Sequence, residues 1–393
     1  MYESFIAGGE DHIIMEAYLD NSATTRPCDA AIDAMTACMR EGFYNPSSVY
    51  APSVREFQHV RACRELILKT LHAGDHNLVF TSGGTESNNL AILGTVARMR
   101  GKQVLAVSAV EHPSVRESFA YLAAQGHDVR VIGVNRAGEL DYAALERALQ
   151  DGASLVSCMQ VNNETGALLD MKKLYQTVNG RAIVHVDGVQ GFMRVPADLK
   201  YADMYTLSGH KIHGPKGIGA LVFRKNIRFA PRQIGGGQEN GLRSGTENTP
   251  GIAGLMAAVQ AMIDLGPDMA DRLMQNKLYL LAQFRAAVPE LIVNGPDPES
   301  AAPHIINLGF PGVRGEVMLH ALEAERIYVS TGSACSSKKL KVSAVLTEMG
   351  IAPATAEWAL RFSLSPHTTR EEIAYAAQKA GAIYEQLKKY ARR

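Results

Sequence analysis

The stretch Met204-Tyr205-Thr206-Leu207-Ser208-Gly209-His210-Lys211-Ile212-His213-Gly214-Pro215-Lys216-Gly217-Ile218-Gly219 organises the rest of the chain. Its first residues form a short apolar run typical of a buried strand, and Lys211 follows just past the strand end. Ligand crevices of open α/β sheets lie at such ends. The glycines and proline from Gly214 onward favour a turn. Lys211 is either a solvated loop lysine or, if fixed in a crevice, an amine able to form a Schiff base.

Apolar runs typical of strands recur from residue 77 to 223, separated by stretches with helical spacing. The runs are Leu78–Thr81, Val104–Ser108, Val129–Ile132, Leu155–Met159, Ile183–Val186, Met204–Leu207 and Ala220–Phe223. The helical stretches between them are Ser87–Met99, Val115–Gln125, Tyr142–Leu149 and Lys172–Val178. This alternation predicts an α/β protein with a mainly parallel, doubly wound, seven-stranded sheet flanked by helices.

The chain of 393 residues is longer than one hydrophobic core usually serves, so we expect two domains. The large domain is predicted to span residues 18–262. Residues 1–17 and 263–393 are expected to form a smaller α+β domain. The long helical stretches Thr249–Leu265 and Met269–Val288 mark the passage between them.

Composition narrows the class of protein. Hydrophobic residues at 46% and charged residues at 20% are ordinary for a soluble globular protein. Forty basic residues balance forty acidic ones, which argues against general nucleic-acid or membrane affinity. No lysine or arginine precedes Arg26, unlike secretory or transit peptides. The five cysteines form no C-x-x-C pair, which argues against disulfides and against a zinc site, so no metal is expected. A cytoplasmic enzyme is the simplest interpretation.

Two motifs at strand ends suggest a phosphate-bearing ring as ligand. Thr81–Asn88 follows a strand and opens a helix, so Gly84 and Thr85 are candidates for holding a phosphate; an ordinary βα turn is the alternative. Asp187 ends another strand, where a carboxylate can pair with a protonated pyridine nitrogen or simply cap a helix. His112 could stack on a flat ring or transfer protons, unless it is a structural histidine.

Three further stretches carry polar or reactive groups. Asn163 is a candidate polar contact after the strand Leu155–Met159. The stretch Gly241–Asn248 offers a cation and hydroxyls that could meet a phosphate of its own or of a neighbouring subunit. Cys335 lies among serines and glycine in a loop of about residues 329–341, where the nearby lysines or a cofactor charge could raise its thiolate fraction. An incidental surface thiol is the alternative.

Taken in this order, the motifs resemble those of the NifS/IscS-type cysteine desulfurases, which are pyridoxal 5′-phosphate (PLP) enzymes of the class-V aminotransferase family and of fold type I. The likeness runs from Tyr18 to about Ser365. It implies that Lys211 carries the PLP as a Schiff base and that Asp187 pairs with the ring nitrogen. It further implies that His112 stacks on the ring and assists proton transfer.

The resemblance also implies the remaining contacts. Gln190 and Asn163 would touch the ring substituents. The phosphate would be held by Gly84, Thr85, Ser208 and His210, together with Thr246 from the second subunit of a homodimer. Arg361 would bind the substrate carboxylate with help from Asn21 and Asn163, because its planar fork pairs with carboxylate bidentately.

The implied reaction converts L-cysteine to L-alanine, with the sulfur held as a persulfide on Cys335 and passed to an acceptor protein. That acceptor would be an iron–sulfur scaffold or a thiolation enzyme, and the residues do not say which. A selenocysteine or cysteine-sulfinate lyase, or an aminotransferase, of the same superfamily is one alternative. A catalytically idle sulfur-relay or scaffold protein is another, although Lys211, Asp187, His112 and Cys335 are all present.

Overall fold

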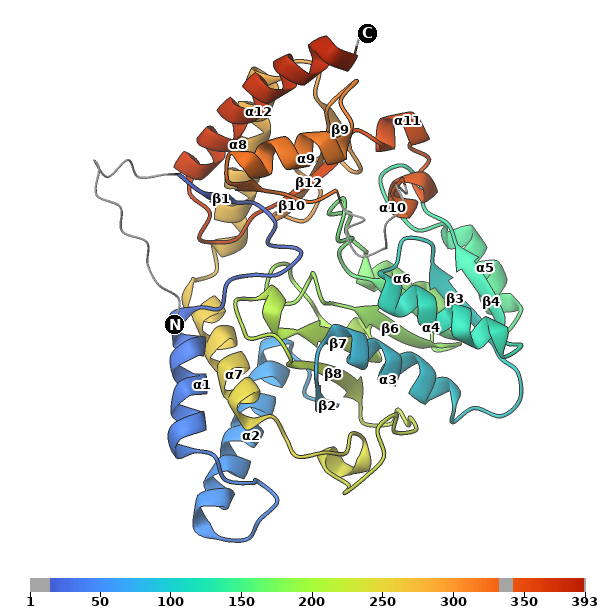
Figure 1. Cartoon of the computed structure of the whole chain (residues 1–393). Coiled ribbons are helices and arrows are strands. Elements are labelled where there is room, and N and C mark those ends of the chain that lie inside the picture. The colour runs from blue at the N-terminus through green and yellow to red at the C-terminus, as the bar shows by residue number, and fades with distance from the viewer. Residues whose placement is uncertain (1–14, 332–341, 392–393) are drawn as a thin grey trace.

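The computed structural model of the chain describes residues 15–331 and 342–391. A seven-stranded sheet with the order β2-β8-β7-β6-β5-β3-β4 forms its centre (Figure 1). The strands are β2 (His76–Thr81), β3 (Val104–Ser108), β4 (Asp128–Ile132), β5 (Ala153–Met159), β6 (Ile183–Asp187), β7 (Met204–Ser208) and β8 (Gly219–Arg224). The pairs from β7 through β4 are parallel, whereas β8 runs antiparallel to both β7 and β2. The predicted mainly parallel seven-stranded sheet is therefore confirmed.

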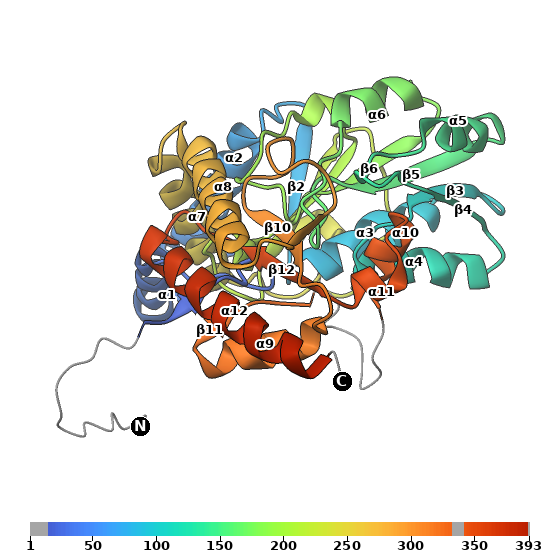
Figure 2. The ribbon, with the colours of Figure 1, turned by 90° about the horizontal axis from the view of Figure 1, so that it is seen from above.

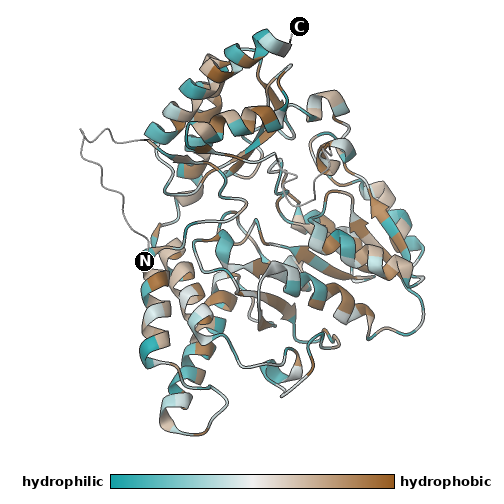
Figure 3. Ribbon diagram, viewed as in Figure 1, coloured by the Kyte–Doolittle hydropathy of each residue, from teal (hydrophilic) through white to brown (hydrophobic). Residues whose placement is uncertain are grey.

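Helices cover both faces of this sheet (Figure 2). Helices α3 (Gly84–Val96) and α4 (Pro113–Ala124) lie on one face, and α5 (Tyr142–Gln150) and α6 (Met171–Val178) on the other. Successive side chains of a strand point to opposite faces, so Leu105 and Val107 join one core while Ala106 joins the other. Hydrophobic residues accordingly concentrate on the strands and on the inner helix faces (Figure 3).

Three helices pack together beside the sheet. They are α1 (Asp29–Glu41), α2 (Ala51–Thr70) and α7 (Thr249–Asp264), and α7 contacts both of the others. Short 3₁₀ helices occupy the connections η1 (Leu199–Tyr201), η2 (Gly209–Lys211) and η3 (Glu239–Gly241). None of the helices in the described ranges combines the length and apolar character needed to cross a bilayer.

The C-terminal part of the chain forms a second group of elements. Its sheet has the order β12-β10-β9, with β9 (Ile292–Asn294), β10 (Ile305–Gly309) and β12 (Ala359–Ser363), all antiparallel. Its helices are α8 (Met269–Ala287), α9 (Gly315–Ala324), α10 (Ala344–Glu348), α11 (Pro353–Ala356) and α12 (Arg370–Ala391). Strand β1 (Ala17–Tyr18) joins this group by pairing in parallel with β11 (Ile327–Tyr328). The arrangement is compatible with the predicted domain boundaries, which stay a prediction.

Candidate active site

Lys211 is the last residue of the 3₁₀ turn that follows β7. Its Nζ donates hydrogen bonds to the main-chain oxygens of Ser22 at 2.5 Å and of Ala23 at 2.7 Å. Burial, together with the cations Arg194 and Arg361, lowers the pKa of the amine to about 7. The side chain therefore has a substantial neutral fraction at physiological pH, as an attacking amine requires.

Asp187 is the last residue of β6, and its carboxylate is buried. Oδ2 accepts a hydrogen bond of 2.8 Å from the Asn88 amide, and Oδ1 accepts one of 3.0 Å from the main-chain N–H of Val189. Asn88 also donates to Ser114 Oγ at 2.9 Å. The carboxylate is thus held in one orientation, at the end of the strand beside the one that leads to Lys211.

His112 lies at the start of α4, where the main-chain N–H of Ser114 donates to its Nδ1 at 3.2 Å. Ser114 Oγ is 2.8 Å from the same nitrogen. Because Nδ1 accepts, a neutral imidazole carries its proton on Nε2. Burial lowers the pKa of His112, against the opposing effect of the Asp187 carboxylate. The ring is therefore mostly neutral at physiological pH.

The turn between β2 and α3 provides room and donors for an anion. Gly83 has a φ of 150°, in the region that favours glycine, and α3 begins at Gly84. A Cβ at Gly84 would lie only 2.7 Å from Val189 Cγ2. A side chain at this position would therefore fill the space beside the turn. The buried Ser208 Oγ faces this turn and has no hydrogen-bond partner among the described residues. Thr85 is exposed in the first helical turn.

An unpartnered buried hydroxyl beside free helix N–H groups suits a phosphate. His210 follows Ser208 by two residues, and its Nδ1 contacts Thr24 Oγ1 at 3.1 Å. Burial lowers the pKa of His210 to about 4, so it is a neutral contact at physiological pH. Together with the lysine and the fixed carboxylate, these residues fit PLP.

Arg361 lies on β12 and its guanidinium is held at two of its three nitrogens. One terminal nitrogen pairs with Asp20 Oδ1 at 2.5 Å, and the other donates to the main-chain oxygen of Asn163 at 3.0 Å. The Nε is buried without a partner in the described part of the chain. This oriented fork with a spare donor is suited to a small carboxylate.

Two predicted contacts already use their amide groups within the protein. Asn21 Nδ2 donates to the main-chain oxygen of Ser363 at 3.0 Å, which joins the N-terminal loop to β12. Gln190 Nε2 donates to the main-chain oxygen of Ser22 at 2.9 Å, and its Oε1 accepts from Arg194 at 3.0 Å. These bonds position the loop around Lys211, and the predicted ligand contacts of both residues stay predictions.

For two other predicted residues, the structure gives no contact with this site. Thr246 is exposed on the loop between η3 and α7. Cys335 lies outside the described residues.

Sequence reasoning did not single out Asn88, Asp20 or Arg194, although each contacts a predicted site residue. Asn88 lies inside the motif Thr81–Asn88, and Asp20 directly precedes Asn21. Their positions next to predicted site residues were therefore a weak indication that they belong to the site. Arg194 follows Gln190 by four residues, and no pattern marked it. A fourth residue, Glu111, is buried beside His112.

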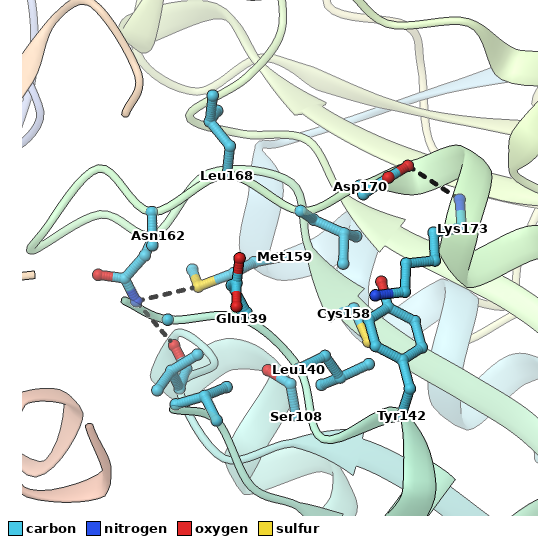
Figure 4. A pocket seen from close by; sticks show the side chains of 15 residues that line it. Ser108, Glu139, Leu140, Tyr142, Cys158, Met159, Asn162, Leu168, Asp170 and Lys173 are labelled. Carbon is cyan, nitrogen blue, oxygen red and sulfur yellow. Dashed lines mark hydrogen bonds between the residues drawn. The ribbon is translucent and has the colours of Figure 1, made fainter. Parts of the chain in front are cut away.

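A separate pocket of about 150 Å³ opens between β3, β5 and α6 (Figure 4). Ser108, Tyr142, Cys158 and Lys173 line it, and none of the predicted site residues does. In the described ranges, no group of three or more histidine, cysteine or acidic side chains could hold a metal ion.

The chain matches the family described as "Aminotransferase class-V" over residues 17–375, so it belongs to that family. Within the family, the curated relatives it resembles are cysteine desulfurases. The cysteine desulfurase of Trichormus azollae is 38% identical over 381 residues, covering 94% of this chain and 93% of that protein. The cysteine desulfurase NifS of Azotobacter vinelandii is 37% identical over 377 residues, covering 95% of this chain and 94% of that protein.

Two similar solved structures are also those of NifS-like proteins. A NifS-like protein superimposes with a TM-score of 0.87 at 32% identity, covering 95% of this chain and all of that one. A NifS-like protein from Rickettsia africae has a TM-score of 0.84 at 29% identity. The predicted family and fold are therefore confirmed.

Proposed function

We propose that this protein is a PLP-dependent cysteine desulfurase that converts L-cysteine to L-alanine and retains the sulfur on Cys335. The observation that carries the proposal is the Lys211 amine, whose pKa burial lowers to about 7, beside a fixed, buried Asp187 carboxylate. PLP, when bound, supplies an electron sink for carbanion chemistry at the α-carbon of an amino acid. Lys211, Asp187, His112, Ser208 and the N-terminus of α3 would hold it.

Asp187 and Arg361 have the two binding roles in the proposed reaction. Asp187 would pair with the pyridine nitrogen of bound PLP, because hydrogen bonds from Asn88 and Val189 fix the orientation of its carboxylate. Arg361 binds the substrate carboxylate through its free Nε, which orients the α-carbon.

Lys211 removes the α-proton, since a substantial fraction of its amine is neutral at physiological pH. His112 holds its own proton at Nε2, where it can be exchanged with the substrate.

The sulfur step uses Cys335. Its thiolate attacks the sulfur of the substrate, so that an S–S bond forms and the carbon–sulfur bond of the substrate breaks. The electron pair of the broken bond goes to the β-carbon, which takes up a proton and becomes the methyl group of alanine. An acceptor thiolate then attacks the outer sulfur of the persulfide on Cys335, so that an S–S bond forms on the acceptor, the S–S bond to Cys335 breaks, and Cys335 leaves as a thiolate. Iron–sulfur assembly or thiolation proteins are the proposed acceptors.

We further propose that the enzyme is a homodimer in which Thr246 reaches the phosphate of the other subunit. Two observations support this. Thr246 is exposed on its own chain. The connection between α1 and α2 exposes large apolar side chains, including Phe43 at 67% and Val49 at 94%, and such a patch favours association.

The test is the release of alanine and sulfide from L-cysteine in the presence of a thiol reductant. Lys211→Ala and Cys335→Ala should both lose activity, and Cys335→Ala should keep the yellow colour of bound PLP. The matched controls Lys216→Ala and Cys38→Ala should behave like wild type. Activity that survives without Cys335, or requires a keto acid, would mean a lyase or an aminotransferase. A wild-type protein without colour or turnover would favour the relay or scaffold function.

A further inference from the structure

Arg194 is a buried cation without a counter-ion. Its exposed fraction is 3%, and within the described part of the chain no carboxylate pairs with it. Its two terminal nitrogens instead donate to three uncharged oxygens. These are Gln190 Oε1 at 3.0 Å, the main-chain oxygen of Asn21 at 3.3 Å, and the main-chain oxygen of Lys211. Burying a charge in this way costs free energy.

The residues that accept from Arg194 are linked to the Lys211 amine through the main-chain oxygen of Ser22. Ser22 follows Asn21, and its main-chain oxygen accepts hydrogen bonds from both Lys211 Nζ at 2.5 Å and Gln190 Nε2 at 2.9 Å. Arg194 therefore closes a ring of contacts that holds the main chain of Lys211 at one point and its amine at another. A change at Arg194 would loosen both ends together.

The charge of Arg194 acts on the same amine. Arg194 and Arg361 both lower the pKa of Lys211, whereas Asp20 and Asp187 raise it. His112 and His210 also face this amine, and burial keeps both mostly neutral at physiological pH. Burial lowers the pKa of Arg194 itself to about 9, so it remains a cation at neutral pH.

We propose that Arg194 is a positioning residue for Lys211: its fork fixes the lysine turn against the Asn21–Ser22 loop and places a buried positive charge near the amine. This inference rests on the proposed function, in which Lys211 forms the Schiff base with PLP. Arg194 itself contacts neither the substrate nor the reacting atoms in this assignment.

The test compares Arg194→Gln and Arg194→Lys as PLP-loaded proteins, with the exposed Arg181→Gln as control. The pH midpoint of the visible PLP band should rise by about one unit in Arg194→Gln, because a buried cation near the Schiff base has been removed. Arg194→Lys should keep the midpoint within about 0.3 unit, since the charge is retained. The kcat should fall about tenfold in Arg194→Gln and recover partly in Arg194→Lys, with KM little changed.

A loaded Arg194→Gln protein with the wild-type midpoint would overturn the proposal, even if its melting temperature had fallen. If the Arg194→Gln variant does not fold, the Arg194→Lys variant tests the proposal instead. A wild-type kcat in that variant would contradict the role of the fork, and a reduced kcat at an unchanged midpoint would support it. A wild-type protein that shows no PLP band would refute the proposed function instead.

Discussion

Asn88 Nδ2 lies 2.8 Å from Asp187 Oδ2, and both side chains are buried at the junction of α3 and the central sheet. The same amide nitrogen lies 2.9 Å from Ser114 Oγ, which contacts His112 Nδ1 at 2.8 Å. One amide group therefore links the carboxylate that is predicted to pair with the ring nitrogen to the imidazole that is predicted to stack on the ring. The geometry makes Asn88 a positioning residue for both.

Replacing Asn88 by alanine should weaken PLP binding and lower kcat, each by about tenfold. The buried carboxylate would lose one hydrogen bond, and such a loss typically costs about 1–3 kcal/mol. PLP affinity measured by absorbance and steady-state kinetics would check this. The matched control is Asn89→Ala, whose amide donates only to the main-chain oxygen of Thr85. Equal losses in the two variants would contradict the role of Asn88.

Replacing Arg361 by glutamine should raise KM for L-cysteine about 30- to 100-fold and change kcat less. The variant removes a charge-assisted bond to the substrate carboxylate, worth about 2–3 kcal/mol. It also leaves Asp20 without its partner, so the melting temperature should be recorded as well. Arg370→Gln, on α12, is the control. An unchanged KM in a folded Arg361→Gln protein would show that the carboxylate binds elsewhere.

Glu111 should make stability fall as the pH rises. Its Oε1 accepts from Ser108 Oγ and from the Met159 N–H, both at 2.6 Å, whereas Oε2 is buried without a partner in the described ranges. Burial, together with the nearby Asp187 charge, raises the pKa of Glu111 from 4.5 to about 8. Between these values the folded protein binds more protons than the unfolded chain, so its stability is full below 4.5 and is lost toward 8.

Glu111→Gln removes this titration with little change of shape. The free energy of unfolding of the variant minus that of wild type should therefore increase from about pH 5 to about pH 8, by on the order of 3 kcal/mol. Urea denaturation across this range measures the difference. A difference that is independent of pH would show that Glu111 is ionised in the folded protein.

Cysteine labelling should separate Cys335 from the buried thiols. Burial raises the pKa of Cys63 to about 12 and that of Cys158 well above its usual range, and both side chains are inaccessible. Brief treatment of the native protein with iodoacetamide at neutral pH should modify Cys335 and spare these two, because only the thiolate reacts. Mass spectrometry of peptides gives the extents. Modification of Cys63 or Cys158 before unfolding would contradict the buried assignment.

The order of elements followed from sequence, with small errors at their ends. The predicted strand Val104–Ser108 matches β3, and the stretch Ser87–Met99 overlaps α3, which begins three residues earlier at Gly84. Glycine has a low helix propensity, so the sequence did not predict a helix start at Gly84. In the structure the close packing of Gly84 against Val189 allows the helix to begin at this residue. Strand β9 and helix α11 were not predicted, because three or four residues carry too little periodicity to be recognised.

The sequence by itself determined the fold class, because strand periodicity is a local property of the chain. The family and the predicted site followed from the resemblance of the motifs around Lys211, Asp187 and His112. Only the tertiary structure decided that Asn88 holds Asp187, that Asp20 pairs with Arg361, and that Arg194 lies against Lys211. These contacts join segments separated by 17 to 341 residues. Their burial and charge, and hence the pKa of Lys211, arise only when the segments meet.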